Sequence, residues 1–289
     1  MRAEGLIVKG IGGFYYVKTD CSIIECRARG KFRKDAVSPQ VGDYVTIDLL
    51  DDGTGSVAQI MPRKNIFIRP PVANIDEFII VAAAKNPAPD LTFIDKMTVI
   101  ASHKGVGVTL CINKTDLVDN VHEIASIYRK AGFEVVEVSA QNRVGIEELR
   151  SRLKGKVIAF TGFSGVGKSS ILNLLSDKFQ LETGEVSKKL SRGRHTTRHV
   201  ELLEYEQASY LVDTPGFSML DLPDIAPEEL ETLFPEFEPF LGQCRFRGCS
   251  HTAERDCAII HAVECGEIAP SRYENYKTFY QTLKTAKQW

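Results

Sequence analysis

The sequence predicts a multidomain protein built of three parts: an N-terminal all-β, OB-like barrel, a central α/β domain and a C-terminal, mainly helical domain. Short β-rich runs separated by glycine-containing turns fill about the first 70 residues. Strand-like and helix-like segments then alternate, and the alternation stops after "DTPGF". The remainder is helix-like and contains four of the seven cysteines. We therefore place the domains at residues 1–70, 71–221 and 222–289.

The barrel is predicted from its hairpin signals. "LIVKGIGGFYYVKT" contains two β-rich runs around the turn formed by Gly12 and Gly13. "SIIECRARGKF" and "GDYVTIDLL" continue the pattern, and "DDGTGS" is the next turn. Several short strands in a segment of this length favour a five-stranded barrel. We interpret the following "MPRKN" as a linker.

The central domain is predicted from the alternation of its segments. "IDEFIIVAAA" has the continuous apolar character of a fully buried strand, and "LTFIDKMTVIASHKG" resembles a helix. The same alternation continues through "VGVTLCIN", "HEIASIYRKAG", "FEVVEVSA", "VGIEELRSRLKG" and "KVIAFTG" to "SYLVDT". This order is typical of a mostly parallel sheet with helices on both faces.

Composition narrows the class of protein. The apolar fraction is 43%, the net charge is −2, and no apolar run is long enough to span a membrane. The N-terminus lacks the apolar run of a signal peptide, so we expect a cytoplasmic protein. An odd number of cysteines in a reducing compartment indicates free, catalytic or metal-bound thiols. Local charge is uneven: "CRARGKFRK" is basic, "LPDIAPEELETLFPEFEPF" is acidic, and the tail "RYENYKTFYQTLKTAKQW" is basic and aromatic.

A phosphate-binding loop is predicted between a strand and a helix. "GFSGVGKS" fits the pattern G-x-x-x-x-G-K-[ST], with "KVIAF" before it and "SSILNLL" after it. Backbone N–H groups and the helix N-terminus would face the phosphates. Lys168 would bridge the β- and γ-phosphates as a catalytic residue, and the Ser169 hydroxyl would bind Mg²⁺. The loop comprises Gly162, Phe163, Ser164, Gly165, Val166, Gly167, Lys168, Ser169 and Ser170.

A guanine-reading motif follows an earlier strand. "NKTD" comprises Asn113, Lys114, Thr115 and Asp116. The Asp116 carboxylate would accept two hydrogen bonds from guanine; adenine lacks both donors, so a buried Asp would be left unpaired. Asn113 would tie the base and the loop together, and the Lys114 stem would cover the ring. "VSA", with Ser139 and Ala140, ends another strand, and the Ala140 N–H could donate to guanine O6.

"DTPG" ends a strand downstream of the phosphate loop. Asp213 suits a second Mg²⁺ contact through water, and the Gly216 N–H suits the γ-phosphate. The alternative is a simple Pro-Gly turn. "SRGRHTTRH" lies between the two motifs, where a switch segment with a Mg²⁺-binding threonine should sit. Thr197 or its neighbour Thr196 would join Ser169 and Asp213 in the magnesium set.

The water-positioning glutamine of many GTPases is missing, because Phe217 occupies its place after "DTPG". Either another residue replaces the glutamine or hydrolysis is slow until a partner completes the site. His195 in the switch segment can accept a proton or hydrogen-bond a water. We hypothesise that His195 is catalytic; the alternative is an ordinary solvated loop histidine.

A metal site is predicted in "CRFRGCSHTAERDC". Cys244, Cys249, His251 and Cys257 lie within 14 residues and form a Cys₃His set, which is typical of a closed, structural Zn²⁺ site. The surrounding residues are too polar for a core. His261 and Cys265 could compete as ligands, but they lie in the helix-like run "AIIHAVECGEI", where core packing suits them better.

Taken in order, these motifs resemble the RsgA family of circularly permuted, ribosome small-subunit-dependent GTPases. The similarity covers nearly the whole chain and includes "VGDYVTI", "NKTD" before "GFSGVGKSS", "GRHTT", "DTPGF" and "CRFRGCSHTAERDCAI". It implies a barrel, a permuted GTPase domain and a helical zinc domain. It also implies binding to the 30S subunit late in its maturation and GTP hydrolysis there. An ordinary GTPase runs from the phosphate loop through the switch and "DxxG" to the base-reading motif and "SA", whereas here the base-reading motif and "SA" come first. One cut after "DTPG" and one join through "RSRLKGK" interconvert the two orders.

The leading hypothesis is therefore a GTPase whose partners are GTP, GDP, the 30S subunit and its 16S rRNA. The basic run of the barrel would contact rRNA phosphates, and Tyr15 and Tyr16 could stack on unpaired bases. We expect Mg²⁺ with GTP, one structural Zn²⁺, no membrane partner and a monomer. Two other classes stay open: a small-molecule kinase and a GTP-binding module with negligible turnover.

Overall fold

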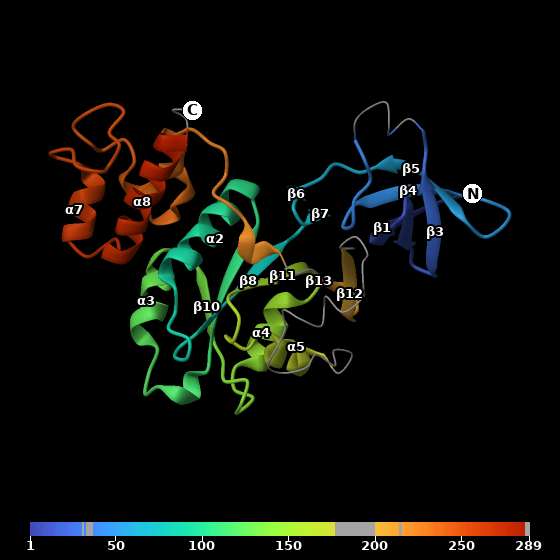
Figure 1. Cartoon of the computed structure of the whole chain (residues 1–289), viewed down its shortest axis with the longest axis horizontal. Helices are drawn as coiled ribbons and strands as arrows, with labels where there is room; N and C mark the ends of the chain where they lie inside the picture. The colour runs from blue at the N-terminus through green and yellow to red at the C-terminus, as the bar shows by residue number, and fades with distance from the viewer. Residues whose placement is uncertain (31, 33–36, 177–199, 214–215, 287–289) are drawn as a thin grey trace.

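A computed structural model describes residues 1–30, 32, 37–176, 200–213 and 216–286. The barrel and the C-terminal helical part lie at opposite ends of the central α/β part, which connects them (Figure 1). Within the described ranges, no helix combines the length and the apolar character needed to cross a membrane.

The N-terminal part is a closed five-stranded barrel, as predicted. The strand order is β1-β2-β3-β5-β4, and β1 closes the barrel by pairing with β4 as well as β2. Gly12 and Gly13 form the first hairpin turn with φ of 60° and 85°, a conformation that favours glycine. The strands are β1 (Arg2–Ile11), β2 (Phe14–Lys18), β3 (Ile23–Ala28), β4 (Tyr44–Leu49) and β5 (Gly55–Ile60).

A small hairpin follows the predicted linker "MPRKN" directly. Strands β6 (Ile66–Ile68) and β7 (Pro71–Ala73) pair with each other, and Val72 also bridges to Val41 of the barrel. Phe67 and Val72 are buried. Strands of three residues are too short to give a sequence period, so the hairpin could not be predicted.

The central part is an α/β sheet with the predicted alternation. The strand order is β10-β9-β8-β11-β13-β12, parallel except for β12. Helices α2 and α3 pack on one face, and α4 and α5 on the other. The elements are β8 (Glu77–Ala83), α2 (Leu91–Lys104), β9 (Gly107–Asn113), α3 (His122–Lys130), β10 (Glu134–Glu137), α4 (Ile146–Leu153), β11 (Val157–Thr161), α5 (Lys168–Leu175), β12 (Glu201–Glu206) and β13 (Ser209–Asp213).

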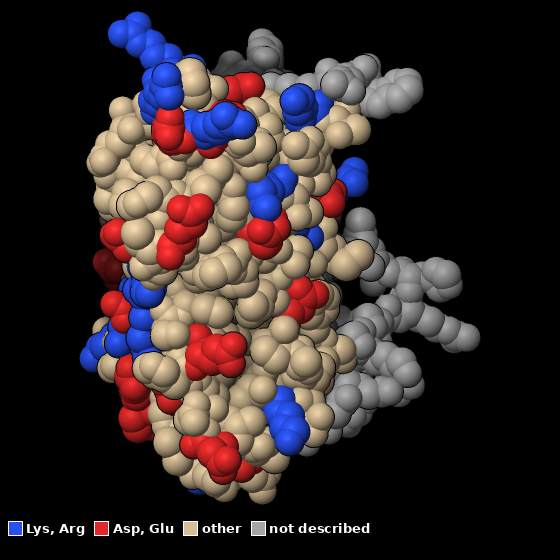
Figure 2. All heavy atoms as spheres, turned by 90° about the vertical axis from the view of Figure 1, so that its left-hand side faces the viewer, with Lys and Arg blue, Asp and Glu red and all other residues tan. Residues whose placement is uncertain are grey.

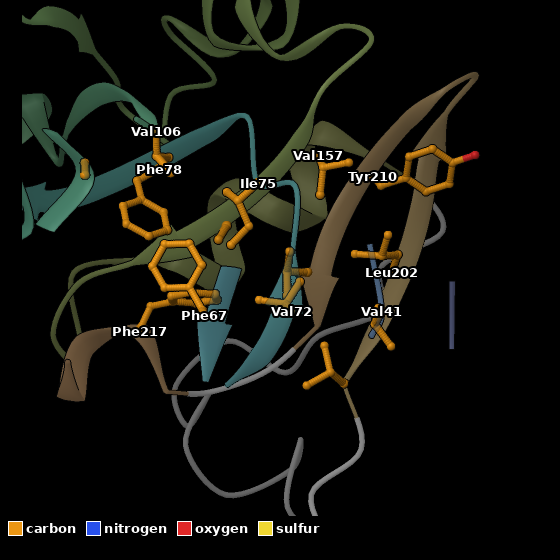
Figure 3. Close-up of a cluster of buried hydrophobic side chains, with 14 of the residues drawn as sticks. Val41, Phe67, Val72, Ile75, Phe78, Val106, Val157, Leu202, Tyr210 and Phe217 are labelled. Atoms are coloured by element: carbon orange, nitrogen blue, oxygen red, sulfur yellow. The ribbon is translucent and has the colours of Figure 1, made fainter. Parts of the chain in front are cut away.

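The barrel and the central sheet are joined into one sheet of eleven strands, because β12 lies beside β1 and pairs with it at Lys9 and Glu201. One cluster of buried side chains continues from the barrel into the central part (Figure 3). The sequence predicts two separate units, so this continuity is a finding of the structure.

The C-terminal part has its own core and is mainly helical, as predicted. Its buried side chains include Phe234, Phe237, Ile259 and Tyr276, and they pack against Val99 of α2. On the face shown in Figure 2, Lys and Arg are interspersed with Asp and Glu, without a large region of one sign. The elements after β13 are the 3-10 helices η2 (Phe217–Met219), η3 (Pro227–Leu233) and η4 (Pro235–Phe240), then α7 (Ala258–Glu264) and α8 (Pro270–Ala286).

Candidate nucleotide site and metal centre

The predicted nucleotide motifs meet at one edge of the sheet although the chain separates them by up to 100 residues. Strand β9 ends at Asn113, β11 leads into Gly162, and β13 ends at Asp213. These strands are parallel, so their carboxyl ends lie at the same edge. The phosphate loop follows β11 beside β8, where the connections switch from one face of the sheet to the other. Ligands of open α/β sheets bind at such a switch point.

Two glycines of the phosphate loop are required by close backbone approach. A Cβ on Gly162 would lie 2.3 Å from the Val81 carbonyl oxygen, and one on Gly167 would lie 2.2 Å from Asn113 Nδ2. Their φ angles are 142° and 98°, which also favour glycine. At these two positions the loop backbone therefore lies too close to β8 and to Asn113 for any side chain to fit.

Lys168 and Ser169, near the end of the phosphate loop, are the first two residues of α5. Lys168 Nζ donates to the carbonyl oxygens of Gly162 at 2.6 Å and Phe163 at 2.7 Å, so its ammonium lies over the loop. Burial lowers the pKa of Lys168 to about 8, which a nearby phosphate would counteract. The Ser169 hydroxyl is buried and has no hydrogen-bond partner among the residues that the structure describes. A buried oxygen of this kind fits the role of a Mg²⁺ ligand.

Asn113 connects the base-reading motif to the phosphate loop. Its Nδ2 donates to the Val166 carbonyl oxygen at 2.8 Å, and its Oδ1 accepts from the Ala140 N–H at 3.1 Å. Asn113 is buried, so both bonds are protected from water. One side chain thus holds together three motifs that are distant in sequence. The Ala140 amide, predicted to donate to guanine, is bonded to Asn113 in this structure.

Asp116 is exposed rather than buried. The hydroxyl of buried Ser139 donates to Asp116 Oδ1 at 2.5 Å and orients the carboxylate. The Thr115 N–H donates to the Val138 carbonyl oxygen at 3.3 Å and attaches the motif to the end of β10. The prediction that Asp116 is buried before a base binds is therefore wrong, and a base bound here would itself have to cover the carboxylate.

The structure describes two residues of the "DTPG" motif, Asp213 and Gly216. Asp213 is half-buried at the end of β13 and lies opposite Glu201 of β12. Burial, and then the charge of Glu201, raise the pKa of the Asp213 carboxyl, and a cation beside it would have the opposite effect. Both features fit a Mg²⁺ contact. The predicted residues His195, Thr196 and Thr197 lie outside the described residues.

Phe217, which replaces the expected glutamine, is a core residue. It is buried and packs against Phe67 of β6 and Phe78 of β8, with ring centroids 5.7 Å and 5.3 Å away (Figure 3). The side chain therefore points into the junction with the barrel linker. It cannot position a water, and its buried role was not foreseen from the sequence.

The four predicted metal ligands come together in the C-terminal part. The candidate ligand atoms of Cys244, Cys249, His251 and Cys257 all lie within 4.8 Å of one another. His251 Nδ1 is 3.4 Å from the Cys244 sulfur and 3.3 Å from the Cys257 sulfur, and those two sulfurs are 3.8 Å apart. Tetrahedral Zn²⁺ with sulfur ligands requires sulfur atoms about 3.8 Å apart. Burial raises the pKa of Cys249 to about 12, so a cation is needed to hold it as the thiolate. The cluster is thus compatible with one zinc ion.

A carboxylate that the sequence did not reveal completes this site. Glu231 Oε2 lies 2.7 Å from His251 Nε2, the ring nitrogen that faces away from the thiols. Such a carboxylate fixes the tautomer in which Nδ1 is free to bind metal. Glu231 lies 20 residues before His251, inside an acidic stretch, so no spacing rule indicated it.

His261 and Cys265 are not part of the four-ligand group. The predicted helix is present as α7, and Ile259 and Ala262 are buried in the core. However, His261 and Cys265 are exposed, so the prediction that both pack in the core is wrong. They occupy the outer face of α7, with Cys265 Sγ 3.7 Å from His261 Nδ1.

The residues predicted to contact RNA have different surroundings. Tyr15 and Tyr16 pack partly against the barrel core, and the Tyr16 hydroxyl donates to Glu25 at 3.0 Å. Arg27 is exposed and lies over the Phe14 ring, 4.5 Å from its centroid, whereas Arg29 pairs with Asp48. The rest of the basic run, Lys31, Arg33 and Lys34, lies outside the described residues.

Comparisons with known proteins match this architecture over nearly its full length. A model of the RsgA N-terminal domain matches residues 4–57, and a model of the RsgA GTPase matches residues 60–223. A protein of Caldanaerobacter subterraneus subsp. tengcongensis named "Small ribosomal subunit biogenesis GTPase RsgA" is 48% identical, with 98% of this chain and 96% of the relative covered. A protein of Geobacillus sp. with the same name is 43% identical, with 99% of each chain covered.

Two solved structures agree with the fold. YjeQ from Thermotoga maritima has a TM-score of 0.87 at 38% identity, and 98% of this chain and 99% of that chain are covered. YloQ, described as a circularly permuted GTPase, has a TM-score of 0.83 at 34% identity, and 99% and 96% are covered. The motif order and the strand order found here are those of a permuted GTPase. The chain therefore belongs to the RsgA GTPase family, and it is a circularly permuted enzyme that hydrolyses GTP.

Proposed function

We propose that this protein is a biogenesis factor of the small ribosomal subunit, which binds the 30S particle late in its maturation and hydrolyses GTP in response. The relatives that match over their whole length bear the name of such a GTPase. The observation that supports stimulated hydrolysis is Phe217. Because this side chain is buried in the barrel junction, the position after "DTPG" supplies no water-orienting group. A partner would have to complete the site.

The proposed roles of the site residues follow from their positions. Asp116 reads the guanine edge, the Lys114 stem covers the ring, and Asn113 fixes the distance between base and phosphates. The loop from Gly162 to Ser170 surrounds the phosphates with backbone N–H groups, and Lys168 stabilises the charge that develops on the transferred phosphate. Gly216 serves the γ-phosphate. His195, which lies outside the described residues, is assigned from the sequence alone to position the attacking water once a partner is bound.

Two metal ions fit the residues present. Ser169 and Asp213, with Thr197 or Thr196, would hold Mg²⁺, which would neutralise phosphate charge when GTP is bound. Cys244, Cys249, His251 and Cys257 would hold one structural Zn²⁺. Four protein ligands leave no open position, so the zinc would stabilise the fold and take no part in hydrolysis.

We also propose that the barrel contacts 16S rRNA, with exposed Arg27 over Phe14 as the described part of a basic and aromatic surface. Base stacking on such a surface tolerates many sequences. The division into domains at residues 1–70, 71–221 and 222–289, a monomeric state and a cytoplasmic location belong to the same proposal.

The test is turnover of GTP and ATP by the purified full chain, with and without purified 30S subunits. The proposal predicts that 30S subunits raise the turnover of GTP by on the order of tenfold or more and do not change the turnover of ATP. An Asp116→Asn variant is the matched control, because its affinity for GTP should fall by about a hundredfold. Its affinity for xanthosine triphosphate should rise, because the 2-oxo group of that base accepts a hydrogen bond from the new amide. ATP-dependent product formation would instead indicate a kinase. Tight GTP binding without turnover under either condition would indicate a regulatory module.

A further inference from the structure

Strand β12 connects the nucleotide site to the barrel. It begins at Glu201 and runs antiparallel to β13, so that Glu201 lies opposite Asp213, the proposed magnesium contact. Its other neighbour is β1 of the barrel, through the pair Lys9 and Glu201. The same residue of β12 therefore faces the catalytic domain on one side and the barrel on the other.

Two barrel lysines hold this strand by charge. Lys9 Nζ lies 2.8 Å from Glu201 Oε2, and Lys18 Nζ donates to Glu204 Oε2. Lys18 Nζ also lies 5.9 Å from the centroid of the Tyr210 ring, which belongs to β13. Lys9 and Lys18 come from adjacent strands of one hairpin, and the two glutamates belong to one strand. The barrel thus binds β12 at two points along its length.

Apolar packing lies behind these ion pairs. Leu202 of β12 and Tyr210 of β13 are buried in the same cluster as Val41 and Val72 (Figure 3). The hydrophobic effect behind this packing is non-directional. The ion pairs are directional, and they add to the pairing of β1 with β12 in fixing where β12 sits against the barrel.

We propose that Lys9 and Lys18 are positioning residues of the GTPase: they fix β12 against the barrel, so that engagement of the barrel by a partner changes the position of β12 and of Asp213 beside it. This inference rests on the proposed stimulation by the 30S subunit. Neither lysine contacts the described part of the nucleotide site, and both act through Glu201 and Glu204.

The effect should be modest and specific. The side chains of the four residues are between 28% and 36% exposed, so each pair is a partly solvated ion pair. Such pairs contribute little to stability. Loss of both should reduce the stimulated kcat by about threefold to tenfold, and should leave the KM for GTP and the affinity for 30S subunits nearly unchanged.

The experiment compares two double variants, Lys9→Gln with Lys18→Gln and Glu201→Gln with Glu204→Gln, and the quadruple variant. The kcat and KM for GTP are measured with and without 30S subunits, along with 30S binding. Arg2→Gln is the matched control, because exposed Arg2 pairs with Asp48 of the barrel itself and makes no ion pair with the described residues of β12. Arg2→Gln should keep the stimulation of the unmodified protein.

We expect both double variants to lose stimulation by 30S subunits to the same extent. The quadruple variant should lose no more stimulation than either double variant. If only the lysine variant loses stimulation, and loses 30S affinity with it, the lysines bind RNA directly and the inference is wrong. Full stimulation in both double variants would also overturn it. If the unmodified protein itself is not stimulated, the proposed function fails, which is a separate result.

Discussion

The two junctions of the central domain are built differently. The barrel meets it through apolar side chains, one pairing between β1 and β12, and ion pairs at the surface. The C-terminal part also packs apolar side chains against Val99 of α2, but in addition it meets the central domain through a buried charge network around Arg272 of α8, whose side chain is 1% exposed. Arg272 Nη1 lies 2.8 Å from Asp95 of α2, and its Nε and Nη2 both donate to Glu236 of η4.

The difference concerns how each junction responds to displacement. A buried guanidinium between two carboxylates needs all its bonds at once, because each unpaired charge would be desolvated without compensation. The barrel junction relies instead on non-directional apolar packing and on partly solvated ion pairs that contribute little to stability. We therefore expect the C-terminal part to move with α2 as one body, and the barrel junction to be the one that responds to binding.

Substitution of Arg272 is expected to have the largest effect on stability among the variants that test the two junctions. Arg272→Ala leaves Asp95 and Glu236 buried without a cation, which should lower the free energy of unfolding by about 3–5 kcal/mol. Urea denaturation of the zinc-loaded full chain measures this. Lys277→Ala, which breaks an exposed pair with Glu274 on the same helix, is the control and should change stability by about 0.5 kcal/mol or less.

A companion variant separates charge from packing at this junction. Adding Asp95→Asn and Glu236→Gln to Arg272→Met removes all three charges together. This variant should recover a large part of the lost stability, since no unpaired charge remains. If Arg272→Ala alone costs no more than the Lys277 control, the network is not what holds the C-terminal part in place.

Substitutions of Phe217 test the barrel junction, again by urea denaturation of the full chain. Phe217→Ala leaves a cavity between Phe67 and Phe78 and should cost about 3 kcal/mol. Phe217→Leu keeps most of the volume and should cost about 1 kcal/mol. Equal losses in the two variants would show that the cluster does not depend on packing at this position.

Glu231 tests the metal centre of the C-terminal part. Glu231→Gln removes the carboxylate beside His251 Nε2 but keeps a hydrogen-bonding group, so zinc affinity should fall by about tenfold. Competition with a chromogenic chelator measures the affinity. Glu228→Gln on the same 3-10 helix is the control and should leave affinity unchanged. An unchanged affinity in Glu231→Gln would exclude the orienting role.

The smallest expected effect is that of the Lys9–Glu201 pair on stability. A double-mutant cycle with Lys9→Gln and Glu201→Gln should give a coupling energy of about 0.2–1 kcal/mol that shrinks in high salt. The variants are compared by urea denaturation at low and high ionic strength. A coupling of several kcal/mol would mean that the barrel junction is as rigid as the Arg272 junction.

Local patterns made most of the fold predictable. The apolar run of β8, the Gly12–Gly13 turn and the phosphate loop follow from residues that are neighbours in sequence. The Cys₃His set was found because its members lie within 14 residues. Each of these features depends on spacing that the sequence displays directly.

Features that depend on distant contacts were not predictable. Arg272 lies in a tail whose sequence is basic and aromatic, yet it is buried against Asp95, 177 residues away. Phe217 was identified only by what it cannot do, and its packing partners lie 150 and 139 residues earlier. The joining of the two sheets at β1 and β12 likewise leaves no periodic signal in either strand.

The most direct test of the contrast between the junctions is amide hydrogen exchange of the full chain with a GTP analogue, free and bound to 30S subunits. The account predicts that protection changes in β1 and β12, while the amides of α2 and α8 that surround Arg272 keep the same exchange rates. Changed exchange in α2 and α8, with β1 and β12 unaffected, would contradict it.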